Sequence, residues 1–375
     1  MTDRLAELRT QIDAVDAQLL ELLSQRGRLA RAVGELKQSE RTPVWRPERE
    51  AQILARLAER NPGPLADAAL VAIWREVIAA CRAVERRLRV AFLGPAGTFS
   101  EQAVFAQFGT SIDALPCASI DEVFRATEAG GVDFGVVPVE NSSEGAVNRS
   151  LDQFLASPLL ICGEVSVPVK HNLLTADGTM AGITRICAHP QALAQCTGWL
   201  NRHHPGIERV PVASNAEGAR LAAQEAHTAG IAGDAALALY DVRVVAEAIQ
   251  DDPLNRTRFV VIGHYACAAS GRDQTSLILS VPDRAGAVHA LIEPLARHGV
   301  SMKRFESRPA RQGGWQYYFY VDLLGHQADP PLVAALAELR GQAAFYKSLG
   351  SYPREVLAGA GARAPNPPSQ PPSRP

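Results

Sequence analysis

From about residue 3 to residue 36, apolar residues recur at alternating steps of three and four positions. This spacing predicts one long amphipathic helix with a single apolar stripe. The stripe consists of Leu5, Leu8, Ile12, Val15, Leu19, Leu22, Leu29, Val33 and Leu36. Arg26 occupies the position between Leu22 and Leu29 that should continue the stripe. Because a guanidinium in a packed seam is costly without an anion, we expect Arg26 to face a negative group.

Prolines divide the rest of residues 1–88 into two shorter helices. Pro47 suits the first turn of the second helix, and a Pro- and Gly-rich segment at 61–64 ends it. A third helix is expected from about residue 65 to residue 87. The first helix, about 50 Å long, is too long for three helices of one compact monomer to cover. We therefore expect its stripe to pair with a second copy in an intertwined dimer.

At residue 89 the pattern changes to short apolar strands that alternate with helices as far as residue 266, which is typical of an α/β domain. Segment 275–353 then has the order strand, helix, strand, strand, helix, strand of a ferredoxin-like α+β domain. Residues 358–375 are rich in proline and are expected to be a disordered tail. The sequence thus predicts a multidomain protein with segments 1–88, 89–266, 275–353 and 358–375.

Composition mainly excludes classes of function. The 375 residues are 47% hydrophobic and 21% charged with a net charge of −2, so no basic footprint for nucleic acid is evident. No apolar run is long enough for a membrane span and no export signal is evident, so we expect a cytoplasmic protein without a membrane partner. The six cysteines form no CxxC pair, and we expect reduced thiols, no metal and no cofactor.

Charged residues of the three helices form one candidate site. Arg26 and Lys37 lie about three turns apart on the same helix face. Arg9 lies about 42 Å from Lys37 along the axis, so it can join such a site only in the partner of an antiparallel dimer. Cations with two acids and no nucleophile–base pair suit a small dianion whose reaction needs electrostatic stabilisation. The set consists of Arg9, Arg26, Lys37, Arg49, Glu50, Cys81 and Glu85.

The segments LAELRTQIDAVDAQLLELLSQRGRLARAVGELK and PEREAQIL resemble the all-helical chorismate mutases. The resemblance implies that Arg26, together with Arg9 of a partner chain, binds the carboxylates of chorismate. It implies that Lys37 donates a hydrogen bond to the ether oxygen and to a carboxylate.

The same resemblance implies that Glu50 holds the ring hydroxyl and that Arg49 supports the anion. Cys81 and Glu85 stand where the best-known bacterial member has Ser and Gln. Because an ionised carboxylate only accepts hydrogen bonds, Glu85 must be protonated to donate to the ether oxygen. Arg46 stands where a well-known relative has Asp, which argues against a side-chain role there.

The α/β segment has four strand-to-helix junctions rich in small polar residues, within FLGPAGTFSEQAV, GVVPVENSSEGAV, CAHPQALAQC and VASNAEGARLA. Free amides at helix starts bind carboxylates without a basic side chain, although each junction alone is also an ordinary helix cap. A further strand, PLNRTRFVVIG, opens with Thr257 and Arg258. The polar junction residues are Thr98, Ser100, Glu140, Asn141, Ser142, Ser143, Ser214 and Asn215.

Taken together, GPAGTFSEQA, PVENSSEGAV, HPQALAQC and NRTRFVVIG resemble the prephenate dehydratases. The resemblance implies two lobes like those of periplasmic binding proteins, with prephenate and the junction residues in the cleft. Thr257 is then the residue most tied to dehydration, with Arg258 and Phe259 completing its motif. Because prephenate loses its ring hydroxyl and a carboxylate, we expect Thr257 to donate a hydrogen bond or relay a proton. Ala188 replaces a common Ser, which excludes a hydroxyl role there.

The motifs AGAVHALIEPLARHG and RFESRP resemble the paired motifs of phenylalanine-binding ACT domains. The resemblance implies a regulatory phenylalanine site at the interface of two such domains, although Ala285 replaces a usual Pro. The pattern alone would equally allow a structural dimerisation domain. The implied effector residues are Gly286, Ala287, Val288, His289, Glu306, Ser307, Arg308 and Pro309.

Together the resemblances imply a homodimeric or larger enzyme of phenylalanine biosynthesis. It rearranges chorismate to prephenate, converts prephenate to phenylpyruvate and is inhibited by phenylalanine. Three alternatives stay open. The first is a dehydratase whose helical domain only dimerises, the second takes arogenate instead of prephenate, and the third is a non-enzymatic amino-acid-sensing binding protein.

Overall fold

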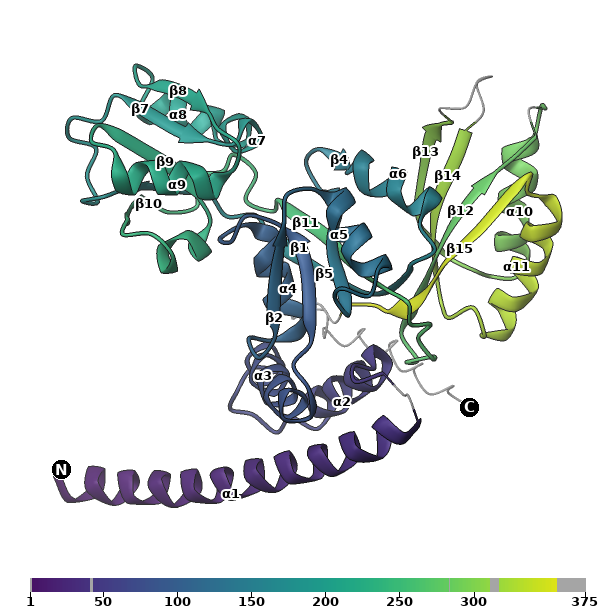
Figure 1. Ribbon diagram of the computed structural model, residues 1–375, viewed down its shortest axis with the longest axis horizontal. Helices are drawn as coiled ribbons and strands as arrows, with labels where there is room; N and C mark the ends of the chain where they lie inside the picture. Colours follow the sequence, from purple (N-terminus) through teal and green to yellow (C-terminus); the bar gives the residue numbers. More distant parts are fainter. Residues whose placement is uncertain (1, 41–42, 283, 311–316, 356–375) are drawn as a thin grey trace, which may run out of the picture.

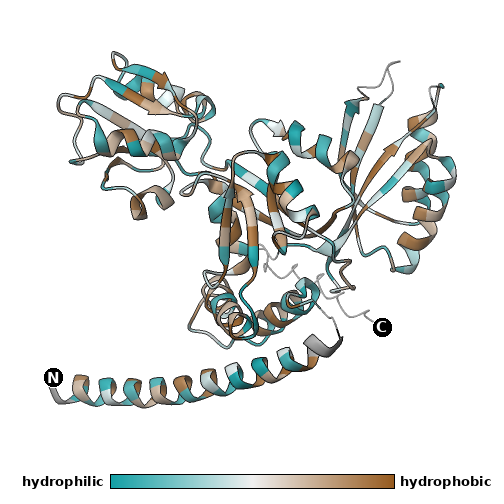
Figure 2. Cartoon of the chain, in the orientation of Figure 1, coloured by the Kyte–Doolittle hydropathy of each residue, from teal (hydrophilic) through white to brown (hydrophobic). Residues whose placement is uncertain are grey.

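Three helices open the computed structural model, which describes residues 2–40, 43–282, 284–310 and 317–355, with the backbone alone for 2–3 and 37–40. They are α1 (Thr2–Glu40), α2 (Pro47–Glu59) and α3 (Asp67–Glu85). α1 extends well beyond α2 and α3 along one side of the molecule (Figure 1). Its apolar residues, spaced along the helix in Figure 2, remain exposed in the single chain. The exposed fraction is 52% for Leu5 and 69% for Leu36, for example. The expected long helix and its two shorter partners are confirmed.

A mixed six-stranded sheet forms the first lobe of the α/β region, with the order β2-β1-β3-β11-β5 and β4 paired to β3. β1 is parallel to β2 and β3, whereas β11 runs antiparallel between β3 and β5. Helices α4, α5 and α6 pack against this sheet. The elements are β1 (Arg89–Leu93), α4 (Phe99–Phe108), β2 (Asp113–Cys117), α5 (Ile120–Glu128), β3 (Phe134–Asn141), β4 (Gly145–Ala146), α6 (Asn148–Ala156), β5 (Leu160–Pro168) and β11 (Arg256–Gly263).

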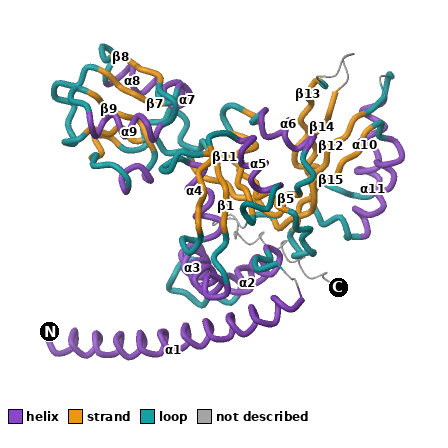
Figure 3. Tube along the Cα trace, in the orientation of Figure 1, coloured by secondary structure: helices purple, strands orange, loops and turns teal. Residues whose placement is uncertain are grey.

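The second lobe has a five-stranded sheet of order β10-β6-β9-β7-β8 and stands apart from the first (Figures 1 and 3). The chain crosses between the lobes twice, and the crossing segments are hydrogen-bonded to each other. Val169 N donates to Asn255 O at 2.8 Å, and Ile249 N donates to His171 O at 2.8 Å. The expected two-lobed architecture is therefore present. The elements are β6 (Asn172–Thr175), β7 (Arg185–Ala188), α7 (Pro190–Gln195), α8 (Thr197–His203), β8 (Glu208–Pro211), α9 (Asn215–Gln224), β9 (Thr228–Ala232), η1 (Asp234–Ala238) and β10 (Arg243–Ala246).

The C-terminal domain is a four-stranded antiparallel sheet of order β13-β14-β12-β15. Helices α10 and α11 cover one face, and the other face looks toward α6 of the first lobe (Figure 1). The expected βαββαβ order is confirmed. The elements are β12 (Asp273–Ser280), α10 (Ala287–Arg297), β13 (Met302–Pro309), β14 (Tyr317–Leu324), α11 (Pro330–Gln342) and β15 (Phe345–Pro353).

The largest hydrophobic cluster extends across these regions. It fills the first lobe, but Trp45 enters it from the segment before α2, and Tyr352 enters it from β15. The Trp45 ring centroid lies 4.7 Å from that of Phe108 and 4.8 Å from that of Phe134. Truncating a buried aromatic side chain to Ala costs about 3–5 kcal/mol, so Trp45 ties the helical region firmly to the first lobe.

Among the described residues, no helix combines the length and apolarity that a membrane span requires. Within the same residues, no grouping of His, Cys, Asp and Glu side chains could hold a metal ion. All six cysteines are buried free thiols. The tail predicted at 358–375 lies outside the described residues.

Candidate functional site

A cavity of about 540 Å³ lies between α1, α2 and α3. Five of the seven residues expected from the sequence line it, together with two further arginines, Arg46 and Arg82. Arg46 pairs with Glu48 and Arg82 with Glu50, so among the described residues Arg26 and Arg49 are the guanidinium groups of the lining that have no ion pair and can face an anion. The expected residues that the cavity brings together are Arg26, Arg49, Glu50, Cys81 and Glu85.

The two acids of the cavity are held in different ways. Glu50 lies in the first turn of α2 and is only 8% exposed. Its Oε2 accepts hydrogen bonds from Trp45 Nε1 at 3.0 Å and Arg82 Nη1 at 3.1 Å. Glu85 packs against Gly34 of α1, where a Cβ atom would lie only 2.4 Å from Glu85 Cγ. A residue without a side chain at position 34 therefore lets α1 lie directly on the Glu85 side chain.

The remaining two cations of the set are placed differently from the rest. Arg9 is exposed on the distant half of α1 and does not line the cavity, as expected for a residue that cannot reach the site of its own chain. The side chain of Lys37 lies outside the described residues. Arg26 does line the cavity, and its Nη1 lies 3.4 Å from Val77 O, a long contact that leaves the guanidinium available to an anion.

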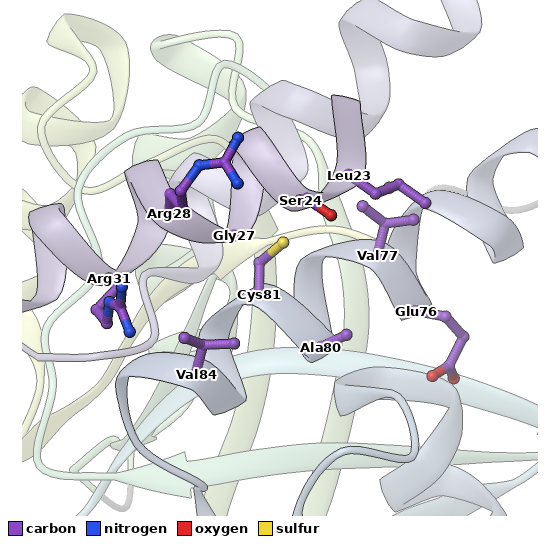
Figure 4. A pocket seen from close by; sticks show the side chains of 10 residues that line it. All are labelled: Leu23, Ser24, Gly27, Arg28, Arg31, Glu76, Val77, Ala80, Cys81 and Val84. Atoms are coloured by element: carbon purple, nitrogen blue, oxygen red, sulfur yellow. The ribbon is translucent and has the colours of Figure 1, made fainter. Parts of the chain in front are cut away.

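A second hollow, of about 620 Å³, opens between α1 and α3 and is shown in Figure 4. Apolar side chains such as Leu23, Val77 and Val84 dominate its lining, with Cys81 shared between the two cavities. Arg28 and Arg31 stand on the α1 side of the hollow in the same view. An apolar hollow beside an exposed apolar stripe is a surface suited to another helix rather than to a dianion.

In the first lobe, Thr257 and Asn141 face each other across the β11–β3 ladder. Asn141 Nδ2 donates to Thr257 Oγ1 at 3.0 Å and to Asn255 Oδ1 at 2.9 Å. Asn141 Oδ1 in turn accepts the backbone N–H groups of Ser143 and Glu144, which fixes the amide orientation. Because the threonine oxygen is an acceptor here, its own proton remains available to another partner.

The other junction residues divide between the two lobes. Ser142 Oγ contacts Asn255 Oδ1 at 3.4 Å and so belongs with the Thr257 cluster. Thr98 precedes α4, and Ser100 is buried in its first turn. The same loop touches the second lobe, because the Phe99 ring lies 5.6 Å from the His171 ring. It therefore lies where the two lobes meet.

Two junction residues lie in the second lobe. Ser214 Oγ caps α9 by accepting Glu217 N at 3.0 Å, and Asn215 Oδ1 accepts His189 N at 3.1 Å. The lobes are also bridged directly, since Gln195 Nε2 donates to Glu144 Oε1 at 2.7 Å. This bridge and Asn255 were not singled out by sequence reasoning, although both lie in or beside the quoted motifs.

Arg258 and Glu140 contact the C-terminal domain, and Phe259 lies in the core. Arg258 pairs with Glu164 at 2.9 Å and with Asp322 of β14 at 2.7 Å. Burial alone would lower the pKa of Arg258, but interactions with Tyr352, Asp322 and Glu164 raise it well above its usual value. Phe259 is buried in the hydrophobic cluster. Arg258 thus lies at the contact with the C-terminal domain, and Phe259 lies in the core.

Glu140 faces the same C-terminal domain. Its Oε2 lies 3.8 Å from Arg258 Nη1 and 3.7 Å from Arg304 Nε of β13. Arg304 Nε and Nη2 are buried without a hydrogen-bond partner among the described residues. Neighbouring residues of β3 and β11 therefore point to opposite sides, with Asn141 and Thr257 on one and Glu140 and Arg258 on the other.

The expected effector residues occupy two separate elements. Gly286 precedes α10 with a φ of 78°, a left-handed conformation suited to glycine, and Ala287 to His289 begin the helix. Glu306, Ser307 and Arg308 lie on the edge strand β13. Arg308 pairs with Asp152 of α6 at 2.7 Å. Among the described residues no hydrogen bond or ion pair joins the two motifs within one chain.

Family models match the chain in three consecutive segments: chorismate mutase type II over residues 8–86, prephenate dehydratase over 90–266 and an ACT domain over 275–341. The chain is 45% identical to a bifunctional chorismate mutase/prephenate dehydratase of Stutzerimonas stutzeri, over 95% of this chain and 99% of the relative. It is 46% identical to the enzyme of that name from Neisseria gonorrhoeae, over 93% of this chain and 97% of the relative.

A solved structure of prephenate dehydratase from Arthrobacter aurescens in complex with L-Phe also resembles this chain. The two share 33% identity and a TM-score of 0.66, over 71% of this chain and 90% of that structure.

Proposed function

The chain belongs to the family of bifunctional chorismate mutase/prephenate dehydratases, and from this premise we propose which of its residues carry each reaction. It rearranges chorismate to prephenate and converts prephenate to phenylpyruvate. The observation that carries the first assignment is the arginine-rich cavity of the helical region. The hydrogen-bonded pair of Asn141 and Thr257 carries the second.

In the mutase reaction, chorismate occupies the cavity between α1, α2 and α3. Arg26 binds the carboxylates together with Arg9 of a second copy, Arg49 supports the anion, and the ring hydroxyl donates to Glu50. The rearrangement needs no nucleophile, so these groups act by holding the dianion and by stabilising charge that develops along the breaking ether bond. Lys37 and a protonated Glu85 donate to the ether oxygen. Arg26 and Arg49, the guanidinium groups of the lining that have no ion pair among the described residues, support this assignment.

In the dehydratase reaction, prephenate binds between the lobes near Thr257. The ring loses carbon dioxide, and the released electron pair expels the ring hydroxyl, which takes up a proton and leaves as water. The Thr257 proton, free of the Asn141 hydrogen bond, is donated toward that hydroxyl. Asn141 and Asn255 hold the threonine in place, while Thr98, Ser100, Ser142, Ser214 and Asn215 line the substrate surface.

A second copy of the chain completes the mutase site by supplying Arg9. The exposed stripe of α1 and the apolar hollow in Figure 4 support pairing with another α1. Mixing Arg9→Ala and Arg26→Ala chains tests this arrangement. Each single variant should have little mutase activity. Mixed dimers contain one intact site, so random re-pairing restores about a quarter of wild-type activity. No recovery would show that Arg9 acts within its own chain or not at all.

The C-terminal domain binds phenylalanine and inhibits the dehydratase. The ACT family match supports this role, with Gly286 to His289 of one copy meeting Glu306 to Arg308 of another. Feedback requires that phenylalanine prefer one of two states of the enzyme.

Assays of the purified chain with chorismate, prephenate and arogenate, each with and without phenylalanine, test the assignments together. We expect turnover of the first two and inhibition at millimolar phenylalanine. Turnover of arogenate in place of prephenate would change the substrate, and absence of chorismate turnover would reduce the helical region to dimerisation.

A further inference from the structure

Glu50 of the mutase cavity is held by two donors that both act on the same oxygen. Trp45 Nε1 and Arg82 Nη1 lie 3.0 and 3.1 Å from Oε2. Among the described residues, Oε1 has no hydrogen-bond partner, and Glu50 lines the cavity. A carboxylate held through one oxygen presents the other in a fixed direction. The ligand hydroxyl therefore meets an acceptor whose position is set before binding.

Both donors are themselves fixed by the first lobe rather than by the helices of the mutase region. Arg82 Nη2 donates to Phe108 O at 2.6 Å, at the end of α4. Its guanidinium also lies 5.9 Å from the centre of the Phe108 ring. The Trp45 indole packs on Phe108 and Phe134 within the hydrophobic cluster of that lobe. The orientation of Glu50 thus depends on contacts with the dehydratase region.

Besides donating a hydrogen bond, Arg82 also balances the negative charge of Glu50. Both side chains are nearly removed from solvent, at 7% and 9% exposure. Burial lowers the pKa of Arg82 against the opposing attraction of Glu50, yet the guanidinium retains its proton in the physiological range. Without Arg82, the nearly buried Glu50 carboxylate would lose its ion-pair partner together with one of the two donors that hold its Oε2.

We propose that Arg82 and Trp45 are positioning residues for the mutase reaction, which aim Glu50 Oε1 into the cavity, and that the dehydratase lobe thereby completes the mutase site. The proposal rests on the assignment of this cavity to chorismate. Arg82 does not need to touch the substrate, because it acts through Glu50. Sequence reasoning missed it, since its neighbours Cys81 and Glu85 already filled the expected face of α3.

The test uses full-length variants and measures mutase kcat and KM at neutral pH. For Arg82→Met we expect at least a tenfold loss of mutase kcat/KM. The loss should fall on kcat more than on KM, because Glu50 stays in the cavity but is no longer held in one orientation. Arg82→Lys keeps a charged donor beside Glu50 and should recover part of kcat. Trp45→Phe keeps most of the packing and should cause a smaller loss of kcat.

Arg75→Met is the matched control. Arg75 also lies on α3 and donates to a carbonyl of α4, Ala106 O, at 2.5 Å, but has no hydrogen bond to Glu50. It should leave mutase kinetics within about twofold of wild type if interdomain contact alone is unimportant. Circular dichroism and prephenate turnover report folding of each variant.

Several outcomes would overturn the proposal. They are wild-type mutase kinetics in both Arg82→Met and Trp45→Phe, or an equal loss in Arg75→Met. If Arg82→Met does not fold, Trp45→Phe alone decides between retained and lost activity. A wild-type chain that does not turn over chorismate would instead refute the assignment of the cavity.

Discussion

Thr257 is a weak acid in water, and the proposed mechanism depends on its hydrogen bond with Asn141. The amide hydrogen bond occupies a lone pair of Oγ1 and leaves the hydroxyl proton to point elsewhere. Two backbone N–H groups fix the amide so that its nitrogen, not its oxygen, faces the threonine. The hydrogen bonds of this loop therefore leave the hydroxyl proton of Thr257 free for another acceptor.

Thr257→Val should abolish this donation while preserving side-chain shape. We expect dehydratase kcat to fall by about 10²–10⁴-fold, the usual worth of a positioned proton donor. Mutase kcat should stay near wild type because the two sites share no residue. Thr257→Ser retains the hydroxyl and should keep most activity. Assays with prephenate and chorismate measure both rates, and an unchanged dehydratase rate in Thr257→Val would remove the residue from the mechanism.

The role proposed for Glu85 predicts how mutase activity depends on pH. Donation to the ether oxygen requires its protonated form, so mutase activity should decrease as pH rises from mildly acid to alkaline conditions. Glu85→Gln supplies a permanent donor and should flatten the profile. A wild-type rate that does not vary with pH would exclude this role. Asp67→Asn, on the exposed first turn of the same helix, serves as the control.

Residue types and spacing could predict which side chains meet in the mutase cavity, but not how they are held. Helix periodicity places Arg26 on the apolar face of α1 and Glu85 one turn from Cys81 on α3, whereas the resemblance to chorismate mutases implied the role of Arg49. The positions of the side chains in the strand motif were harder to predict from the sequence. Alternation along β11 sends Thr257 and Arg258 to opposite sides, and only the structure shows that the C-terminal sheet packs on the Arg258 side. Asn255 carries no pattern that distinguishes it from a turn residue.

At the scale of elements, the approach of α1 to α3 depends on Gly34. Helix periodicity predicted both helices and their apolar faces, but the distance between helices depends on volumes that a pattern of polar and apolar residues does not contain. A Cβ atom at Gly34 would lie 2.4 Å from Glu85 Cγ, whereas nothing lies within 4 Å of a Cβ atom at Gly27. Within one chain, there is therefore no room for a side chain at Gly34, whereas a side chain at Gly27 would meet no neighbour.

Gly34→Ala should destabilise the packing of α1 on α3 by about 1–3 kcal/mol, less any gain in helix propensity. It should also displace Glu85 and lower mutase kcat. Gly27→Ala meets no neighbour within one chain and should stabilise α1 by about 0.5–1 kcal/mol, less any cost of contact with the partner's α1 in the hollow that Gly27 lines. Thermal unfolding with mutase assays measures both effects. Equal stability changes in the two variants would show that Glu85 yields to the added methyl group.

At the scale of the molecule, the C-terminal domain touches the dehydratase lobe through a buried group of charges. Asp322 accepts Arg258 Nη1 at 2.7 Å and Ser276 Oγ at 2.5 Å. Lys347 Nζ donates to three carbonyls at the end of α6, including Ser157 O at 2.6 Å. β13, which carries the expected effector residues, contributes Arg304 and Arg308 to the same interface. Movement of β13 would therefore reach the strands that carry Asn141 and Thr257.

Asp322→Asn should weaken phenylalanine inhibition while leaving the uninhibited dehydratase rate within a few-fold of wild type. We expect the inhibitory concentration to rise by about tenfold, since allosteric coupling is typically 1–3 kcal/mol. Glu338→Gln removes an ion pair with Arg297 on the helical face and should leave inhibition unchanged. Inhibition curves measure both. Wild-type inhibition in Asp322→Asn would place the coupling elsewhere.

The buried indole of Trp45 has a consequence for how such an enzyme could be divided. A gene split at the apparent boundary near residue 88 would leave a hole lined by Phe108 and Phe134 in the downstream product. A dehydratase that evolved without the helical region would need larger side chains to fill this hole, or would have to keep residues 43–46. The structural boundary between the two catalytic parts therefore differs from the sequence boundary near residue 88.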